Sequence, residues 1–466
     1  MFHFRCFVPV LCLSVTSLFN TVHLCAEEQG VVRMWISSED GKYALTEQVV
    51  RLEKYKKSKN ILIEINSEEK YQSILGMGGS LEHATCSNLM KLSPETREEV
   101  IEKLVDPDKG IGMNLMRLCI GTSDFVGEPY YSYNDCPDGE IDIDLTRFSI
   151  EKDRNYVIPI VKLVQQKNPQ VLFFSSPWSP PGWMKDTKTM NSGVLLREYY
   201  PVYAKYLQKY VEAYEGEGIP IYAITVQNEP QMNDKDYPTC VWTAEEQRDF
   251  IRDFLGPCFE KSGITTKIWC WDHNWNNLDF PMTIFNDTVA SKYVDGTAFH
   301  LYEGRVEAQS TLHDAFPDKH IYFTEGSTFL SRGAVKIIEI FRNWARSYNL
   351  WVICLDWQRK PNRGPHHASP TMIVLKEDNT IEYRFDYYMY GQFMKFVKRD
   401  AVRIFSTQGG RYFNNVAFLN PDGTIVLVVA NAESKEQNVS VRCSNMFFNS
   451  EIPAKSVVTY ILKNNS

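Results

Sequence analysis

Two glutamates stand at the ends of short apolar segments, where a carboxyl group could take part in a reaction. Glu229 lies in the segment Thr225-Val-Gln-Asn-Glu-Pro230, and Glu325 lies in Phe323-Thr-Glu-Gly326. Hydrolysis of a glycosidic bond needs two carboxyl groups, one protonated for the leaving oxygen and one ionised to attack the anomeric carbon. A single glutamate after a strand is more often a rim charge or a helix cap. The interpretation therefore depends on which residues accompany the pair.

Aromatic and hydrogen-bonding side chains follow the other apolar segments. They occur in Ser176-Pro-Trp178, at Asn228, in Phe299-His-Leu-Tyr302 and in Asp356-Trp357. Aromatic rings offer apolar faces to the C–H surface of a sugar, and asparagine and histidine can hydrogen-bond its hydroxyl groups. Trp178 alone would more often be a core residue, and His300 alone a structural imidazole. Beside two glutamates, these residues predict a glycoside-binding site.

The elements that must position these residues form a repeated pattern. Short apolar segments end in Gly, Pro, Asn or Asp, and a longer helical pattern follows. Eight segments are predicted to be strands: 74–79, 114–120, 171–176, 221–227, 267–271, 296–301, 320–324 and 350–355. Helices are predicted near 95–104, 151–168, 198–214, 243–262, 281–292, 306–316 and 332–348.

Alternation of strands and helices favours parallel strands joined by crossover helices. Eight such units predict an α/β fold, a closed (β/α)8 TIM barrel, whose functional residues lie at the carboxyl ends of the strands. The alternative is an open, doubly wound parallel sheet. No GxGxxG follows the first strand, which removes the usual reason to prefer that alternative.

The flanking regions have a different pattern. Strands are predicted at 31–36 and 61–65, and short alternating strands at 416–419, 425–430, 439–443 and 457–462. We expect four parts: a signal peptide at 1–26, a β segment at 27–67, the catalytic barrel at 68–399 and a C-terminal β domain at 400–466. The second and fourth parts are expected to pack as one β-sandwich beside the barrel.

The first 26 residues read as a secretory signal peptide. Arg5 is their only charged residue, the chain from Cys6 to Cys25 is mostly apolar, and Ala26 precedes two glutamates. An uncleaved membrane anchor is the alternative, which Pro9, Asn20 and His23 weaken. We therefore expect a secreted, periplasmic or lysosomal protein without a stable membrane span.

Charge and cysteine spacing exclude several classes of protein. The net charge of −8 argues against a surface that binds nucleic acid or anionic lipid. No cysteine or histidine spacing is typical of a zinc site, and no metal or organic cofactor is expected. Cys119, Cys270 and Cys354 lie in apolar segments and are expected to be buried thiols, whereas Cys136 and Cys240 lie in loop sequence and could pair. Nothing in the sequence indicates an oligomer.

Several motifs, in the same order along the chain, resemble glycoside hydrolase family 30, in the branch that contains the glucosylceramidases. The resemblance runs from about residue 71 to 403. The motifs are Gly76-Met-Gly-Gly79, Gly110-Ile-Gly-Met-Asn114, Ser123-Asp-Phe125, Ser176-Pro-Trp178, Thr225-Val-Gln-Asn-Glu-Pro230, Phe299-His-Leu-Tyr302, Phe323-Thr-Glu-Gly326 and Asp356-Trp357. It implies a barrel with an attached β-sandwich, in agreement with the strand count.

The resemblance also implies a role for each matching residue. Glu229 matches the acid/base and Glu325 the nucleophile. Asn228 matches the residue that holds the sugar 2-hydroxyl. The remaining matches are Trp178, Tyr302 and Trp357, which would line the first sugar subsite, and Arg117 and His300, which would support the nucleophile.

One position departs from the family pattern. The glucosylceramidases carry an aspartate after the glycines of the first strand, expected to bind glucose hydroxyls, and His83 takes that position here. A neutral imidazole has one donor and one acceptor, whereas a carboxylate accepts from both hydroxyls of a diol. His83 thus makes glucose in the first subsite an open question. Glu82, beside it, is expected to point elsewhere.

The predicted function is that of a secreted, retaining β-glycosidase acting on a β-linked glycoside, glycan or glycolipid. Glu325 would attack the anomeric carbon while Glu229, with a pKa raised by the charge of Glu325, protonates the leaving group. The first alternative keeps the fold but changes the specificity to that of an endo-β-1,6-glucanase, a β-xylosidase or a β-fucosidase. The second is an inactive carbohydrate-binding protein.

Overall fold

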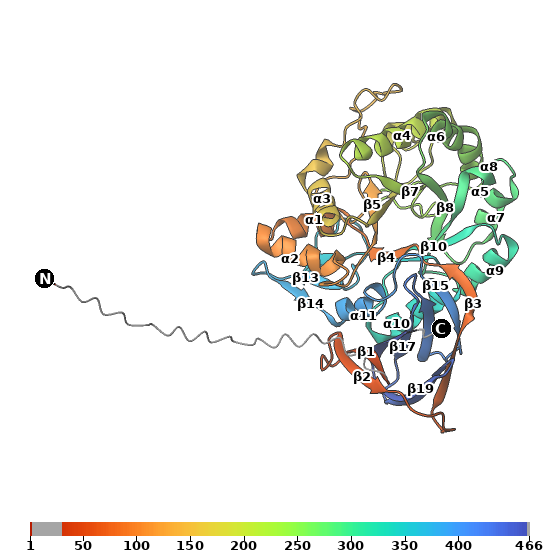
Figure 1. The fold of residues 1–466 in the computed structure, drawn as a ribbon. Coiled ribbons are helices and arrows are strands. Elements are labelled where there is room, and N and C mark those ends of the chain that lie inside the picture. Colours follow the sequence, from red (N-terminus) through yellow and green to blue (C-terminus); the bar gives the residue numbers. More distant parts are fainter. Residues whose placement is uncertain (2–29, 464–466) are drawn as a thin grey trace.

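The computed structural model describes residue 1 and residues 30–463, so the predicted signal peptide lies outside the described residues except for Met1. Parallel strands form a barrel with helices around its outside, and a β-rich domain lies against one side of it (Figure 1). The barrel strands are β4 (Gly76–Gly79), β5 (Leu115–Ile120), β6 (Leu172–Pro177), β7 (Ile221–Thr225), β8 (Lys267–Asn274), β9 (Val294–His300), β10 (His320–Glu325) and β11 (Ser347–Leu350).

Two narrow junctions close the barrel. Strands β5 to β10 form one parallel sheet in sequence order, and β11 pairs in parallel with β4. A bridge between Ser80 and Arg117 joins β4 to β5, and a bridge between Ile321 and Ala345 joins β10 to β11. The predicted (β/α)8 barrel is confirmed, and its closure excludes the open sheet.

The eighth strand begins earlier than predicted, and this part of the sequence prediction was wrong. Helix α10 (Leu330–Arg342) ends before the predicted limit at 348, and β11 occupies Ser347–Leu350. The apolar run that suggested 350–355 leaves the barrel and enters β12 (Cys354–Asp356), which pairs with β13 (Ile373–Leu375) outside it. Both strands are almost wholly buried, so hydrophobicity alone does not separate them.

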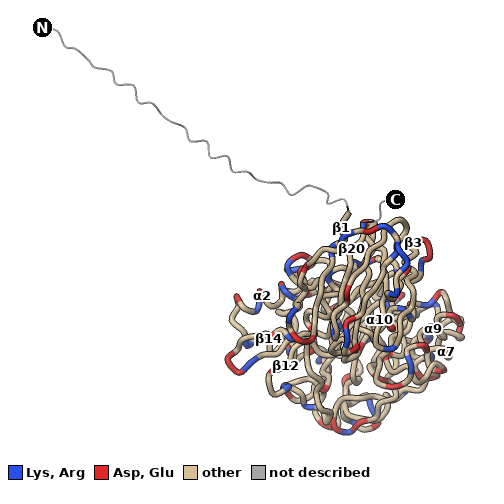
Figure 2. Tube along the Cα trace, turned by 90° about the horizontal axis from the view of Figure 1, so that it is seen from below, with Lys and Arg blue, Asp and Glu red and all other residues tan. Residues whose placement is uncertain are grey.

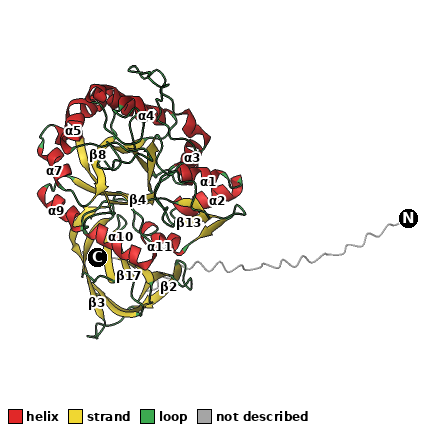
Figure 3. Cartoon of the chain, turned by 180° about the vertical axis from the view of Figure 1, so that it is seen from behind, coloured by secondary structure: helices red, strands yellow, loops and turns green. Residues whose placement is uncertain are grey.

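The helices cover the outside of the barrel (Figure 3). Local sequence signals mark the start of several helices. At the start of α2 (Pro94–Val105), Ser93 accepts a hydrogen bond from the Thr96 amide, and Pro94 takes the first helical position. At the start of α5 (Ala244–Phe250), Thr243 and Glu246 form a capping box. Besides α2, α5 and α10, the helices are α1 (His83–Met90), α3 (Val157–Lys167), α4 (Tyr200–Gly216), α6 (Gly256–Ser262), α7 (Asp279–Asn286), α8 (Ala290–Tyr293), α9 (Glu307–Ala315) and α11 (Phe385–Met394). A π-helical turn at Ile251–Leu255 joins α5 to α6.

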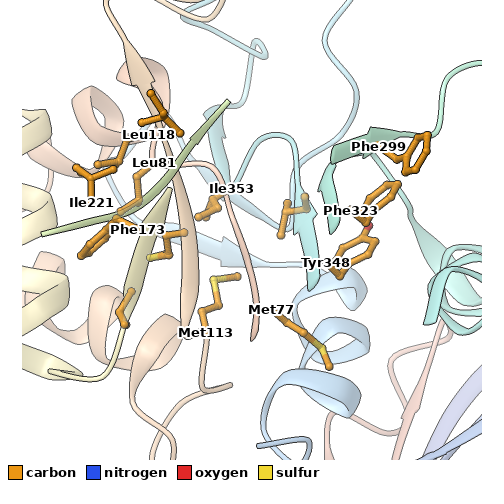
Figure 4. Packing of buried hydrophobic residues seen from close by; sticks show 14 of the residues in the cluster. Met77, Leu81, Met113, Leu118, Phe173, Ile221, Phe299, Phe323, Tyr348 and Ile353 are labelled. Carbon is orange, nitrogen blue, oxygen red and sulfur yellow. The ribbon is translucent and has the colours of Figure 1, made fainter. Parts of the chain in front are cut away.

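Successive side chains of the barrel strands belong alternately to two apolar clusters. Phe174, Trp269 and Tyr322 fill the inside of the barrel, where the last two rings stack at 3.9 Å between centroids. Phe173 belongs instead to the larger cluster between strands and helices, as do the residues labelled in Figure 4. This alternation follows from the opposite directions of successive side chains on a strand. The packed interior leaves only the two ends of the barrel open for chemistry.

The β-rich domain combines segments from both ends of the described chain. Its sheet has the order β19-β18-β3-β15-β16-β17-β20-β1-β2. The strands are β1 (Val31–Ser38), β2 (Thr46–Arg51), β3 (Ile61–Ser73), β15 (Val402–Ser406), β16 (Phe413–Leu419), β17 (Thr424–Asn431), β18 (Gln437–Cys443), β19 (Met446–Ile452) and β20 (Ser456–Lys463). The Glu53 amide donates to the Phe447 carbonyl at 2.8 Å, which links the two ends of the sheet.

Strand β17 shows how this domain is attached to the barrel. Ile425, Leu427 and Val429 lie in the core of the β domain, whereas Val426 and Val428 belong to the cluster shared with the barrel helices. Both faces of the strand are therefore buried, which explains its continuous apolar sequence. The predicted packing of N- and C-terminal segments into one β domain is confirmed, and β3 continues to Ser73, past the predicted boundary at 67.

The cysteines, the surface charge and one small strand are the last features of the fold. Cys119, Cys270 and Cys354 are buried thiols, as predicted, and Cys136 and Cys240 are not joined. Lys, Arg, Asp and Glu residues are interspersed over the face seen in Figure 2. Within the described residues, no helix is both long and apolar enough to cross a membrane. A third small strand, β14 (Ile381–Tyr383), pairs with β13.

Candidate active site

A cavity of about 350 Å³ lies at the carboxyl ends of the barrel strands. Five of the nine predicted site residues line it: Trp178, Asn228, Glu229, Tyr302 and Glu325. A larger cavity of about 730 Å³ lies between the barrel and the β domain, and none of the nine contributes to it. The cavity of about 350 Å³ is the candidate active site because Glu229 and Glu325 both line it.

Glu325, at the end of β10, is held by a permanent cation and a phenol. The Arg117 guanidinium donates to Oε2, and the Tyr302 hydroxyl donates to Oε1 at 2.9 Å. Arg117 is fully buried, and its positive charge lies directly beside the carboxylate. Glu325 is therefore held in a fixed position facing the cavity.

Glu229 lies just after β7 in the left-handed backbone region, with φ of 51°. Its amide donates to the Asp272 carbonyl at 3.0 Å, which holds this uncommon conformation. The side-chain Oε1 lies 3.2 Å from Nδ1 of His300 and 3.5 Å from Nδ1 of His273. Two imidazoles, and no permanent cation, thus face this carboxyl.

Titration of Glu229 is governed by these imidazoles. Burial alone would raise the pKa of Glu229, but His273 and His300 outweigh it and hold that pKa well below its usual range. Burial lowers the pKa of His300, but Glu325, Asp272 and Glu229 outweigh it and raise the pKa to about 9. The expected rise in the Glu229 pKa is contradicted, because the sequence did not reveal the second imidazole. The acidic proton is shared by the Glu229–His300 pair.

Asp272, at the end of β8, connects the two glutamates and was missed by the sequence analysis. Its carboxylate is fully buried and accepts hydrogen bonds from five side chains: Arg117 at 2.9 Å, Ser176 at 2.8 Å, Thr225 at 2.7 Å, His300 Nε2 at 3.0 Å and Thr324 at 2.6 Å. Burial would raise the pKa of Asp272, but Arg117 and His300 lower it well below its usual range. Asp272 thereby orients the groups that contact both glutamates.

Arg117, on β5, also fixes Asn228 and the aromatic wall. Its guanidinium donates to Asn228 Oδ1 at 2.7 Å and lies 4.8 Å from the centre of the Trp178 ring. Burial disfavours the charge of Arg117, but Asp272 and Glu325 outweigh it and raise its pKa above the usual value. Arg117 and His300 are thus buried and in contact with residues that line the cavity.

The aromatic wall differs from the prediction at one position. Trp178 stacks on Trp351 at 5.1 Å between ring centres, and both line the cavity. Trp357 is 54% exposed and lies outside the cavity, on the small sheet that begins with β12. The earlier position of the eighth strand brings Trp351, one residue after it, to the mouth of the barrel in its place.

His83 also lies away from the cavity, contrary to the prediction. It is buried at the start of α1, where Nε2 hydrogen-bonds the Tyr131 hydroxyl at 2.6 Å and lies 3.5 Å from Asp153. Glu82 points elsewhere, as expected, and accepts a hydrogen bond from the Thr85 amide. A further carboxyl group that lines the cavity is Asp124, whose pKa is raised to about 8 by burial and by the charge of Glu325.

The remaining wall is built by loops. Met232, Tyr237, His366 and His367 line it, and the His366 ring packs edge-on against Tyr237. Buried Lys185 holds the neighbouring loops together by donating to Ser179 Oγ and to the Met190 and Thr239 carbonyls. Met232 and Tyr237 lie in a loop without regular periodicity, so the only signal in the sequence was the position of that loop after a strand.

Comparisons with known proteins agree with this geometry. The sequence model of the glycosyl hydrolase family 30 TIM-barrel domain matches residues 74–397, and that of the family's β-sandwich domain matches residues 400–460. An endo-1,6-β-D-glucanase of Trichoderma harzianum is 31% identical over 433 residues, covering 86% of each chain. The lysosomal acid glucosylceramidase of Mus musculus is 28% identical over 435 residues, covering 86% of this chain and 83% of its own.

Solved structures lead to the same family. A structure of an endo-β1,6-glucanase superposes with a TM-score of 0.85 at 29% sequence identity, covering 94% of this chain and 100% of the other. The barrel, the β domain and the order of motifs all fall within these matches. The chain therefore belongs to glycosyl hydrolase family 30 and is a glycosidase.

Proposed function

We propose that this glycosidase hydrolyses β-linked glucosides with retention of configuration, with Glu325 as nucleophile and Glu229 as acid/base. The observation that carries the proposal is the approach of both carboxylates to one atom. Nδ1 of His300 lies 3.2 Å from Glu229 Oε1 and 3.9 Å from Glu325 Oε1. These oxygens are therefore at most about 7 Å apart, a limit that includes the separation of about 5–5.5 Å typical of retaining enzymes.

The first step forms a glycosyl-enzyme. A Glu325 oxygen bonds to the anomeric carbon, the bond from that carbon to the leaving oxygen breaks, and the proton of the Glu229–His300 pair passes to the leaving oxygen. In the second step Glu229 accepts a proton from water, whose oxygen attacks the same carbon and releases Glu325. Arg117 and Tyr302 hold the nucleophile in place throughout.

Glucose fits the first subsite better than the sequence suggested. The doubt rested on His83, which does not reach the cavity. Asp124, Asn228 and the Trp178–Trp351 pair instead surround the space in front of Glu325. Polar groups at the edge and stacked rings at the side are the elements that bind a pyranose.

The proposed natural substrate is a β-1,6-glucan. The relatives named as endo-1,6-β-glucanases, one of them a solved structure, support it. Beyond the glutamates the cavity is bordered by Tyr237, His366 and His367, which offer rings and hydrogen-bonding groups for a second sugar. Glucosylceramide is the second candidate, because the Mus musculus relative is a glucosylceramidase. Secretion or a lysosomal location would suit either substrate.

A panel of substrates tests the proposal. The panel contains aryl β-glucoside, β-xyloside and β-fucoside, a β-1,6-glucan, and glucosylceramide, with Glu325→Gln as the control. We expect turnover of the glucoside and the glucan, with the β-anomer as the first product seen by NMR. First release of the α-anomer would contradict retention, and turnover of xyloside or fucoside alone would contradict glucose. Glucosylceramide turnover without glucan turnover would select the second candidate.

A further inference from the structure

The acid/base lies in a cluster that a double-displacement mechanism does not require. Glu229, His273 and His300 follow or end three successive strands, β7, β8 and β9. Each offers one ligand atom, and these atoms lie within 4.8 Å of one another. The distances of 3.2 Å and 3.5 Å from Glu229 Oε1 to the two Nδ1 atoms are close to the edge of a tetrahedral zinc site, about 3.3 Å for bonds of 2.0–2.1 Å.

The neighbours of the two imidazoles favour an ion over a simple hydrogen-bond network. His300 donates from Nε2 to buried Asp272, which leaves the lone pair of Nδ1 directed at Glu229 when the ring is neutral. A carboxylate behind the far nitrogen is the usual support of a metal-bound histidine. His273 is more than nine-tenths buried, and its Nδ1 has no hydrogen-bond partner although it faces Glu229.

The donor set selects the kind of ion. Two imidazoles and one carboxylate suit zinc and neighbouring transition metals, whereas calcium and magnesium prefer oxygen ligands alone. A fourth position can be filled from the cavity by water or by Glu325 Oε1, which lies 3.9 Å from His300 Nδ1. The cavity that admits the substrate also admits the ion.

We propose that Glu229, His273 and His300 bind a zinc-class divalent ion, and that this ion reversibly inhibits the enzyme. The inhibition rests on the proposed role of Glu229, whereas the binding rests only on the three residues. A metal-bound Glu229 has no proton for the leaving oxygen and no free lone pair of the same basicity for water.

Direct binding of Zn²⁺ is the primary test. Zn²⁺ is titrated at neutral pH into the full chain in competition with a chromophoric chelator, for the unaltered protein and for His273→Asn. The matched control is His320→Asn, which removes an imidazole at the start of β10, outside the cavity. We expect one ion per chain, more than about tenfold weaker binding in His273→Asn through loss of a protein ligand, and no change in His320→Asn.

Two further measurements separate this proposal from the proposed function. Co²⁺ in the same site should give the intense visible absorption of a four-coordinate ion, whether or not any glycoside is turned over. If the enzyme is active, Zn²⁺ should lower kcat/KM. Failure of the unaltered protein to bind Zn²⁺ up to millimolar concentrations, or equal binding by His273→Asn, would overturn the proposal. Glycoside turnover without Zn²⁺ binding would leave the proposed function intact.

Discussion

The two sides of the active-site cavity are built from different kinds of charge. Glu325 is paired with Arg117, a cation that stays protonated at any ordinary pH, and with the Tyr302 hydroxyl. Glu229 faces His273 and His300, and the pKa of His300 is raised to about 9. A nucleophile must be ionised when it attacks and leaves again as a carboxylate, whereas an acid/base must exchange a proton twice in each cycle.

Asp272 is the element common to both sides. It accepts from Arg117 on one side and from His300 on the other. The buried carboxylate therefore balances the charge of one cation and sets the tautomer of the imidazole that serves the other glutamate. The two glutamates thus differ because Arg117, one partner of Asp272, lies beside Glu325, whereas His300, the other partner, lies beside Glu229. Four predictions test this comparison.

Removal of the proposed nucleophile should have the largest effect. Glu325→Gln is expected to lower kcat on every substrate by about 10⁵-fold or more, since no other group can form the glycosyl-enzyme. The amide oxygen can accept from Arg117 and the NH2 group can donate to the Tyr302 hydroxyl, so the variant should remain folded. The matched control, Glu307→Gln, neutralises a carboxylate of α9 outside this cavity and should remain active. Residual activity of Glu325→Gln near that of the control would assign the nucleophile elsewhere.

Removal of the acid/base should depend on the leaving group. Glu229→Gln is expected to reduce kcat/KM by about 10²–10⁴-fold on glucosides with a poor leaving group, because protonation of that group is lost. Dinitrophenyl glucoside needs no such help, so its first step should be much less affected. The measurement is the ratio of the two losses. An equal loss on both substrates would contradict the acid role of Glu229.

Replacement of the titrating imidazole should move the pH profile. In the unaltered enzyme the shared proton is present below the His300 pKa of about 9 and is lost as the pH rises through it. In His300→Asn, Glu229 must hold the proton alone, and an ordinary carboxyl releases it at much lower pH. The alkaline limb of kcat/KM should therefore shift to lower pH. An unchanged alkaline limb would mean that the Glu229–His300 pair does not set it.

The smallest effect is expected for the two tryptophans near the eighth strand, which are replaced one at a time. Trp351→Ala should reduce kcat/KM by about tenfold through loss of the stacked wall beside the sugar. Trp357→Ala should change it less than twofold, because that ring is exposed outside the cavity. Both variants are measured with the same aryl glucoside. The reverse order would restore the prediction made from sequence.

Much of the fold could be predicted from local sequence patterns, because apolar residues recur with different periods in helices and in strands. Seven of the eight barrel strands overlap their predicted segments throughout most of their length, from β4 to β10. The eighth was displaced because one apolar run feeds two buried strands, β11 and β12. The nine-stranded sheet could be anticipated only in outline, because the pairing of β3 with β15 and β18 joins distant segments.

The sequence by itself determined the two glutamates, because each sits in a motif and at a strand end that a barrel places on one face. It also determined Asn228, Tyr302 and Arg117 as their companions. Only the tertiary structure decided which side chains touch them. Asp124 and Trp351 line the cavity, whereas His83 and Trp357 do not. Asp272 accepts from Arg117 and His300, and His273 lies 3.5 Å from Glu229. Side-chain contacts between strands depend on register and on the exact end of each strand, which no local sequence pattern encodes.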